Sequence, residues 1–410
     1  MDTGNDAVAL PLPIYRSGLH ARRALRFVVM VGVVSLFADM TYEGARSING
    51  QFLGLLGASG FWVSAIAGVG ELTGYGLRMF TGYLADRTGR YWLITMIGFA
   101  VNLLVVPLLA LAGHWQVAGV LIVGERVGKG IRTPARDAML AYAGRSLGSG
   151  WAFGLHEAMD QAGATIGPLL MATVLLWRGN YHMAYAFLLF PAVAALFALM
   201  LARLAFPTPG DLERTSHVPV IDANRRFLFY LCGTSLVAAG FADYSLIAFH
   251  AHALHLIPDV WIPPLYALAM LSAGVSALAF GRLFDRYGVG ALVGATILSA
   301  LFAPCVFLGD ATWIAIGAVL WGVGVGAHES VMRAAVARLF PPHRRASAFG
   351  VFNTVFGVAW FLGSLALGWA YEHSLWNIVV LSVALQVLGV PLLLFARAPG
   401  LSTSTKEIQP

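Results

Sequence analysis

Acidic and basic residues interrupt several of the long apolar runs in this chain of 410 residues. In the first run, Asp39, Glu43 and Arg46 stand four and three positions apart, so on a helix they share one face. Burial favours the protonated form of a carboxylate, and a nearby guanidinium favours the ionised form. The spacing therefore predicts acids that bind and release protons. A structural salt-bridge cluster is the alternative.

Later apolar runs carry similar groups. A charge in the hydrocarbon core costs a few kcal/mol or more, so intramembrane charges usually face a wetted, protein-lined cavity. We expect further proton-coupling acids at Glu71, Glu157 and Asp160, each with an ion pair between helices as the alternative. Further charged and polar side chains in these runs are candidates to line a substrate cavity: Arg46, Arg126, Lys129, Asp243, Tyr244, His328, Glu329 and Arg333.

The composition is that of an integral membrane protein. The chain is 59% hydrophobic and 11% charged, whereas soluble proteins are about 25% charged. A spanning helix needs ~20 mostly apolar residues, and runs of this length exclude barrel strands. The sequence therefore predicts an all-α fold with twelve transmembrane helices at 25–48, 61–83, 91–112, 116–138, 149–176, 181–203, 226–250, 262–283, 290–308, 313–337, 348–371 and 376–396.

The placement of Lys and Arg predicts the orientation. Nineteen of these residues lie on one side of the predicted bundle, in the tails, the loops and the adjoining ends of the spans, and only Arg178 lies on the other. Basic loops stay in the cytoplasm. We therefore expect a multi-pass protein of the plasma membrane, the inner membrane in a bacterium, with both termini cytoplasmic. The net charge is +6, but the basic residues sit in short loops between apolar runs, so this charge does not indicate nucleic-acid binding.

The chain divides into two similar halves. A polar, proline-containing stretch separates the sixth and seventh predicted spans, and the segment from Gly82 to Gly89 recurs as Gly281 to Gly288. Repeats of this kind are typical of transporters built from two six-helix bundles. The predicted parts are a cytoplasmic N-terminal tail (1–24), a first bundle (25–204), a cytoplasmic linker (205–225), a second bundle (226–397) and a C-terminal tail (398–410).

The stretch Gly82-x-Leu84-Ala85-Asp86-Arg87-x-Gly89-Arg90 resembles the loop between helices 2 and 3 of the major facilitator superfamily. The resemblance implies the major facilitator fold, in which two pseudo-symmetric six-helix bundles alternate in access. It also implies that the loop and its repeat form a conformational latch. The residues of that predicted latch are Gly82, Asp86, Arg87, Gly89, Arg90, Gly281, Asp285 and Arg286.

Two further motifs resemble those of the superfamily. Arg126-x-x-Lys129-Gly130 is similar to an Arg-x-x-Gln-Gly element, whose arginine is associated with proton coupling in relatives. The fifth run carries an antiporter-like motif with Met171 at the position of the last glycine, and this motif favours efflux by antiport. Its glycines and proline, which permit bending and close packing, are Gly154, Gly163, Gly167 and Pro168.

These features favour a secondary transporter that exports a small organic molecule by proton antiport. The alternatives are a proton-coupled importer of an organic anion and a non-transporting membrane sensor. We expect no enzymatic activity, because no nucleophile–base arrangement or nucleotide motif is present, and we expect no cofactor. His252 and His255 share a helix face without a nearby cysteine, so we expect no metal site. The predicted partners are the substrate, protons and the bilayer, and the predicted protein is a monomer.

Overall fold

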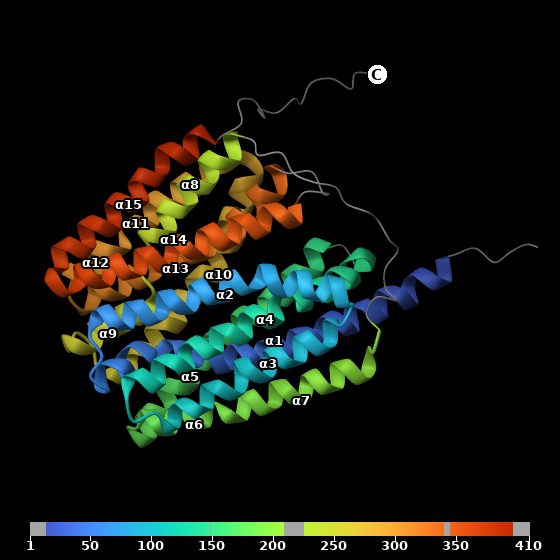
Figure 1. The fold of residues 1–410 in the computed structure, drawn as a ribbon, viewed down its shortest axis with the longest axis horizontal. Coiled ribbons are helices and arrows are strands. Elements are labelled where there is room, and N and C mark those ends of the chain that lie inside the picture. Colours follow the sequence, from blue (N-terminus) through green and yellow to red (C-terminus); the bar gives the residue numbers. More distant parts are fainter. Residues whose placement is uncertain (1–13, 148, 209–224, 340–344, 397–410) are drawn as a thin grey trace, which may run out of the picture.

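The computed structural model describes residues 14–147, 149–208, 225–339 and 345–396, and every regular element in these ranges is a helix. The helices run roughly parallel to the long axis of the molecule (Figure 1). The backbones of Gly154, Asp285, Arg286 and Arg333 are described. Their side chains, or for the glycine its surroundings, lie outside the described part.

We call α1 to α7 the first half of the chain and α8 to α15 the second half. The first half contains α1 (Ile14–Leu55), α2 (Gly60–Thr88), α3 (Tyr91–Leu108), η1 (Leu109–Leu111), α4 (Trp115–Leu147), α5 (Ser149–Arg178), α6 (Tyr181–Phe187) and α7 (Leu189–Ala205). The second half contains α8 (Arg225–Ala239), α9 (Tyr244–Ala253), η3 (Asp259–Trp261), α10 (Ile262–Tyr287), α11 (Val289–Ala300), α12 (Phe302–Leu308), α13 (Ala311–Leu339), α14 (Arg345–His373) and α15 (Leu375–Phe395).

The prediction of an all-helical integral membrane protein is confirmed. Ten helical segments of the described chain are long and apolar enough to cross a membrane. The other two predicted spans correspond to α2 and α4, which have 29 and 33 residues. Both lie along the other helices (Figure 1), but neither meets the criterion of length, hydropathy and charge. The count of twelve therefore rests on ten apolar segments together with α2 and α4.

Three predicted spans are each broken into two helices. α6 ends at Phe187, four residues before Pro191, and α11 ends at Ala300, four residues before Pro304. A proline ring clashes with the carbonyl four residues earlier and removes one helical hydrogen bond, so both breaks follow from these prolines. The third break separates α8 from α9 at Gly240. It positions Asp243, the N-cap of α9.

Each half has its own apolar core. One cluster of buried side chains draws only on residues between Ala24 and Phe206, and two others draw on the second half, apart from Ala164. Between the halves, α2 packs on α14, α5 on α10 and α1 on α9. The contact between the two halves therefore involves α1, α2 and α5 of the first half and α9, α10 and α14 of the second.

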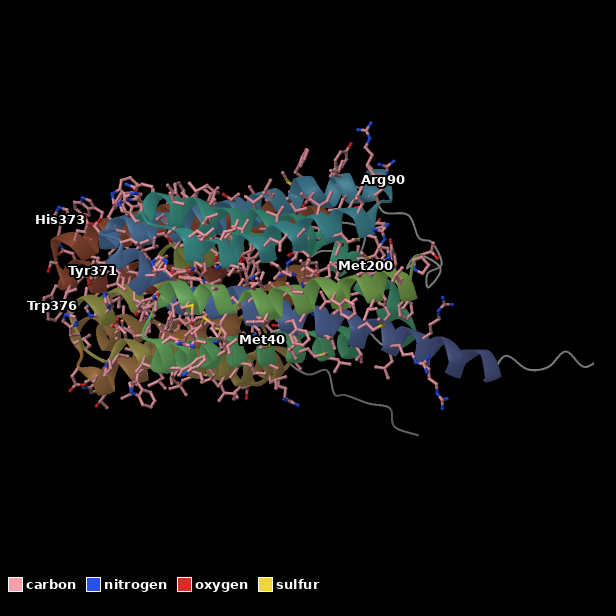
Figure 2. The ribbon with its side chains drawn as sticks, turned by 90° about the horizontal axis from the view of Figure 1, so that it is seen from below. Met40, Arg90, Met200, Tyr371, His373 and Trp376 are labelled. Atoms are coloured by element: carbon pink, nitrogen blue, oxygen red, sulfur yellow. The ribbon has the colours of Figure 1, made fainter. Side chains whose placement is uncertain are left out.

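The two ends of the bundle are identified by residues that lie at them. Arg90 and Met200 lie near one end, and Tyr371, His373 and Trp376 lie at the other (Figure 2). We call them the Arg90 end and the Tyr371 end. The connection from α1 to α2 lies at the Tyr371 end, since Gly60 faces the ring of Tyr371.

Candidate functional site

Arg46 of α1 is the hub of a buried set of ion pairs between the two halves. Its Nη2 atom lies 2.8 Å from Oδ2 of Asp243 and 3.5 Å from Oε1 of Glu71, and Nη1 lies 3.9 Å from Oε2 of Glu43. Asp243 belongs to the second half and the two glutamates to α1 and α2. One guanidinium thus joins helices of both halves.

α4 contributes the remaining bases of this set. Arg126 lies between Glu71, at 3.5 Å, and Glu125, at 3.2 Å. Lys129 Nζ lies 3.6 Å from Oε1 of Glu43. We call these seven side chains the central network; its four carboxylates and three bases are Glu43, Glu71, Glu125, Asp243, Arg46, Arg126 and Lys129.

Asp243 is positioned by the break between α8 and α9. It is the N-cap of α9, where Oδ1 accepts a hydrogen bond of 3.0 Å from the backbone N–H of Ser245. The other oxygen, Oδ2, remains available for Arg46. A helix N-terminus favours a negative charge, so both the local fold and the arginine stabilise this buried carboxylate.

Three polar neighbours of the network were not predicted. The hydroxyl of Tyr266 on α10 donates a hydrogen bond of 2.5 Å to Oε2 of Glu43. Asn102 on α3 donates one of 2.7 Å to Oε1 of Glu125, and the ring of Tyr42 lies 4.2 Å from Lys129 Nζ. Nothing in an apolar run marks a tyrosine or asparagine as a partner, because only the fold brings the acid to it.

Tyr244, a predicted cavity residue, packs beside Tyr266 with ring centroids 4.4 Å apart and ring planes tilted by 53°. It is fully buried, and its hydroxyl donates a hydrogen bond of 2.8 Å to the carbonyl of Ile262 within the second half. The hydroxyl of Tyr244 therefore bonds two parts of the second half to each other, whereas the hydroxyl of Tyr266 bonds the first half.

Asp39 does not join the ion pairs of Arg46, although it shares the predicted helix face. It is buried against α5, and within the described part of the chain it has no hydrogen bond or ion pair. Arg132 of α4 is buried as well, and its three guanidinium nitrogens have no described hydrogen-bond partner. It lies against the rings of Phe99 and Tyr42.

A second polar cluster lies inside the first half, between α1, α4 and α5. Asp160 lies 3.4 Å from Nδ1 of His156 and 3.9 Å from Arg136, and Ser35 bonds Nε2 of His156 at 2.8 Å. Glu157 accepts a hydrogen bond of 3.2 Å from Gln161 one turn along α5. The structure therefore separates Glu157 and Asp160 from the central network.

The predicted candidates on α13 do not meet the ion pairs of Arg46. His328 is buried against the ring of Phe241, with centroids 5.5 Å apart, and lies 3.5 Å from the hydroxyl of Thr296. Glu329 is exposed. The side chain of Arg333 lies outside the described part. Of the predicted cavity residues, the network thus unites Arg46, Arg126, Lys129 and Asp243 with Glu43 and Glu71.

The predicted latch loop lies at the Arg90 end. Gly89 caps α2 at a φ of 64°, a left-handed conformation that favours glycine. Asp86 accepts a hydrogen bond of 3.0 Å from the hydroxyl of Tyr91, and Arg87 donates one of 3.4 Å to Tyr83. The described bonds of these charges thus stay within the first half. In the repeat, Gly281 faces open space, and the side chains of Asp285 and Arg286 are outside the described part.

The antiporter-like glycines allow α1 and α5 to touch backbone to backbone. Gly163 lies against Leu36 and the side chain of Asp39, and Gly167 lies against Met40 and Gly44. Pro168 follows inside α5, and Gly154 lies in the part of α5 whose surroundings are not described. A side chain at either described glycine would separate α5 from α1.

The two halves are held together at the Tyr371 end. The backbone N–H of Phe61 donates a hydrogen bond of 3.0 Å to Oε1 of Glu372, and the hydroxyl of Tyr181 donates one of 2.9 Å to Asp259. Gly50 of α1 lies directly against the backbone of α9 at Ser245. These contacts join the halves between the central network and the Tyr371 end.

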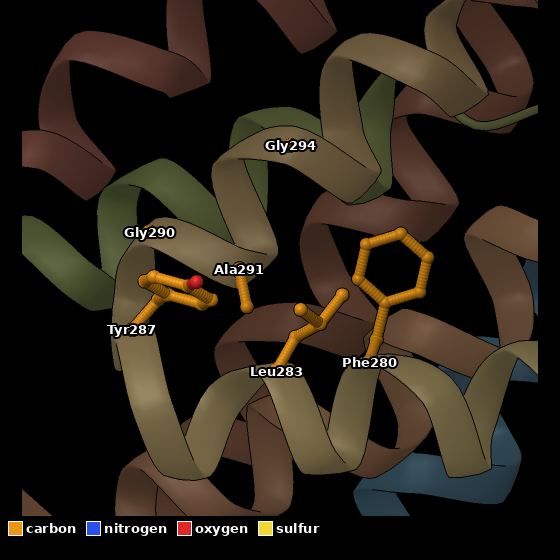
Figure 3. A pocket seen from close by; sticks show the side chains of 6 residues that line it. All are labelled: Phe280, Leu283, Tyr287, Gly290, Ala291 and Gly294. Atoms are coloured by element: carbon orange, nitrogen blue, oxygen red, sulfur yellow. The ribbon is translucent and has the colours of Figure 1, made fainter.

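A small apolar pocket lies elsewhere, where α10 turns into α11 (Figure 3). It has a volume of about 360 Å³ and is lined by Phe280, Leu283, Tyr287, Gly290, Ala291 and Gly294. None of these residues belongs to the central network, so the pocket is separate from the candidate site. In the described ranges, no three His, Cys, Asp or Glu side chains gather as a metal site requires.

A membrane-spanning bundle of two helical halves joined around buried charges defines a membrane transport protein. The family described as the Major Facilitator Superfamily matches residues 27–364 and 261–409. The chain belongs to this superfamily, and the predicted resemblance is confirmed. Membership supports a secondary transporter.

Similar proteins cover nearly the whole chain. The uncharacterized protein Rv2265 of Mycobacterium tuberculosis is 39% identical over 395 residues, which are 94% of this chain and 96% of that protein. The uncharacterized MFS-type transporter MJ1317 of Methanocaldococcus jannaschii is 26% identical over 93% of this chain and 98% of its own. The crystal structure of the nucleoside transporter NupG superposes with a TM-score of 0.69 at 13% identity, covering 90% of this chain and 97% of that one, which shows the fold alone.

Proposed function

We propose that this protein exports a small organic molecule across the plasma membrane in exchange for protons, by alternating access between its two halves. The observation that supports this proposal most directly is the placement of Glu43. Its buried carboxylate contacts Lys129 and Arg46 of the first half and Tyr266 of the second half. Glu43, a group that can bind a proton, thus contributes to the contact between the two halves.

Protonation of Glu43 removes the negative charge that attracts Lys129, Arg46 and the Tyr266 hydroxyl. A hydrogen bond to a charged group stabilises by about 1.5–3 kcal/mol, roughly twice the value for a neutral pair. Proton binding therefore weakens the contact between α1 and α10, and the halves separate more readily at the Tyr371 end. In this proposal Asp39 and the cluster around Asp160 relay protons within the first half.

Two features support export and the orientation. The close contact of Gly163 and Gly167 with α1 fits the antiporter-like motif. The excess of Lys and Arg in the loops at the Arg90 end supports a cytoplasmic location for that end and for both termini. The contacts at the Tyr371 end then close the protein on the side away from the cytoplasm. We further propose that the halves are the two rocking bodies, with the boundaries predicted from the sequence, and that the protein works as a monomer.

Proteoliposomes that enclose the pH-sensitive dye pyranine test the coupling. A library of small organic molecules is added outside, and a substrate that enters by antiport drives protons out and raises the lumenal pH. Import with protons lowers the lumenal pH instead, which identifies the rival symport mechanism. Glu43→Gln should abolish the signal. Arg22→Gln, which removes an exposed charge from the N-terminal part of α1, should retain it.

Two results would overturn the coupling proposal. One is accumulation of a radiolabelled substrate with no change in lumenal pH. The other is an undiminished signal in Glu43→Gln. A thermal melt of each purified variant separates loss of coupling from loss of folding.

A further inference from the structure

Arg78 of α2 is a basic side chain with no acidic partner in the described part of the chain. The three bases of the central network, on α1 and α4, each lie within 4.0 Å of a carboxylate. Among the described residues Arg78 has no ion pair and no hydrogen bond, and its Nε is buried and unpartnered. Its guanidinium lies over the ring of Tyr75, 4.4 Å from the centroid. Arg78 therefore retains its donors for a ligand.

A row of aromatic rings leads from Tyr75 into the second half. Tyr75 packs against Phe356 with centroids 5.6 Å apart, Phe356 against Trp360 at 5.8 Å, and Trp360 against Phe241 at 6.0 Å. The indole N–H of Trp360 is buried and has no described hydrogen-bond partner. A buried indole usually finds an acceptor, so Trp360 offers a donor to a ligand beside the row.

The row lies beside the central network. Glu71 of α2, Lys129 of α4 and Glu329 of α13 are all close enough to Tyr75 to interact with it electrostatically. Helices of both halves therefore surround this tyrosine. Glu71 is already engaged by Arg46 and Arg126, and Lys129 adds a second positive charge on the side of the row toward α4.

These groups define the chemistry of a ligand. A guanidinium presents a planar fork of donors that matches a carboxylate, and it also stacks on aromatic faces. Flat rings prefer to pack against the faces and edges of other rings. An indole N–H bonds an oxygen acceptor. An organic cation would instead meet the unpaired charge of Arg78.

We infer that the transported molecule is a planar aromatic carboxylate, held by Arg78 through its carboxylate and by the row Tyr75, Phe356 and Trp360 through its ring. This inference rests on the proposed transport function and names its substrate class. The arriving negative charge also attracts Lys129, the partner of Glu43. Substrate binding thereby loosens one contact of the proton-binding carboxylate, and the two ligands become coupled.

Direct binding tests the substrate class without a proton gradient. Radiolabelled benzoate is bound to the purified full-length protein in a scintillation proximity assay. Benzylamine and cyclohexanecarboxylate serve as unlabelled competitors. Benzoate should bind, the cation benzylamine should not displace it, and cyclohexanecarboxylate, which has the charge without the flat ring, should displace it only weakly.

The variants locate the site. Arg78→Gln should weaken benzoate binding by about tenfold or more, because the charge-assisted pair is lost. Arg78→Lys keeps the charge but not the planar fork of donors, so its affinity for benzoate should lie between those of the wild type and Arg78→Gln. Arg22→Gln removes an exposed charge from α1 and should bind normally. If Arg78→Gln does not fold, Trp360→Phe removes the indole donor and should also weaken binding.

Three results would overturn the inference: no benzoate binding to the folded wild type, equal displacement by benzylamine, or unchanged affinity in the folded Arg78→Gln or Trp360→Phe variants. Each of these leaves the proton-flux experiment free to succeed with another substrate. Conversely, benzoate binding without proton flux supports the substrate class and contradicts the coupling.

Discussion

Replacing Tyr266 by Phe should shift the balance between the two conformations of this transporter. The change deletes one hydroxyl, whose hydrogen bond of 2.5 Å to Glu43 joins α10 of the second half to α1 of the first. A hydrogen bond to a charged group contributes about 1.5–3 kcal/mol. Since each 1.4 kcal/mol is a factor of ten, loss of the bond should favour the form opened at the Tyr371 end by about 10- to 150-fold.

Pulsed electron resonance distances between spin labels measure this balance. Ser59, the N-cap of α2 without a side-chain cap bond, and Asn377 at the start of α15 are exposed at the Tyr371 end, one in each half. Cysteines at these two positions carry the labels, after Cys232 and Cys305 are replaced by serine. Tyr266→Phe should increase the population at the longer distance.

Tyr244→Phe is the matched control. It deletes an equally buried hydroxyl in the neighbouring ring, but that hydroxyl bonds Ile262 within the second half. It should lower thermal stability and leave the distance distribution unchanged. The reasoning is wrong if the two variants shift the distances equally, or if Tyr266→Phe leaves them as in the wild type.

Three further predictions concern stability. Asp243→Asn leaves Arg46 without its partner at 2.8 Å and should cost about 3–5 kcal/mol, seen as a lower melting temperature; an unchanged melt contradicts the central role of this pair. Gly163→Leu should prevent folding, because even a Cβ there would approach Cβ of Asp39 to 2.9 Å, whereas Gly281→Ala, in open space, should elute as a single species in size-exclusion chromatography. Arg132→Met should not lower the melting temperature, because the arginine is buried without a described hydrogen bond and a well-packed apolar residue at such a site is often neutral or stabilising; a drop of several degrees would show that it has a compensating partner.

The spans could be predicted from the sequence because a bilayer demands long apolar helices. The breaks within three of them could not be placed, although Pro191 and Pro304 were visible. A proline in a spanning helix can kink it, end it or be accommodated by its neighbours. Which outcome occurs depends on packing against other helices, and an apolar run does not encode that packing.

The candidate site could be predicted in part. Spacing alone placed Glu43 and Arg46 on one face, and the structure brings them within 3.9 Å. The same spacing included Asp39, which turns toward α5 instead, because the face of a long helix is shared between several neighbours. Tyr266 had no signal at all, since a phenol in an apolar run becomes a proton-site ligand only when another helix delivers a carboxylate to it.

The unequal number of charges in the central network has an electrical consequence. Four carboxylates face three bases, so the ionised network carries one negative charge and a single bound proton neutralises it. Moving one elementary charge through the full membrane potential changes the free energy by about 2.3 kcal/mol per 100 mV. If the charge on this network changes during the cycle, voltage as well as the pH difference biases which side the site faces. The membrane potential would then act on the protein directly, through one surplus carboxylate.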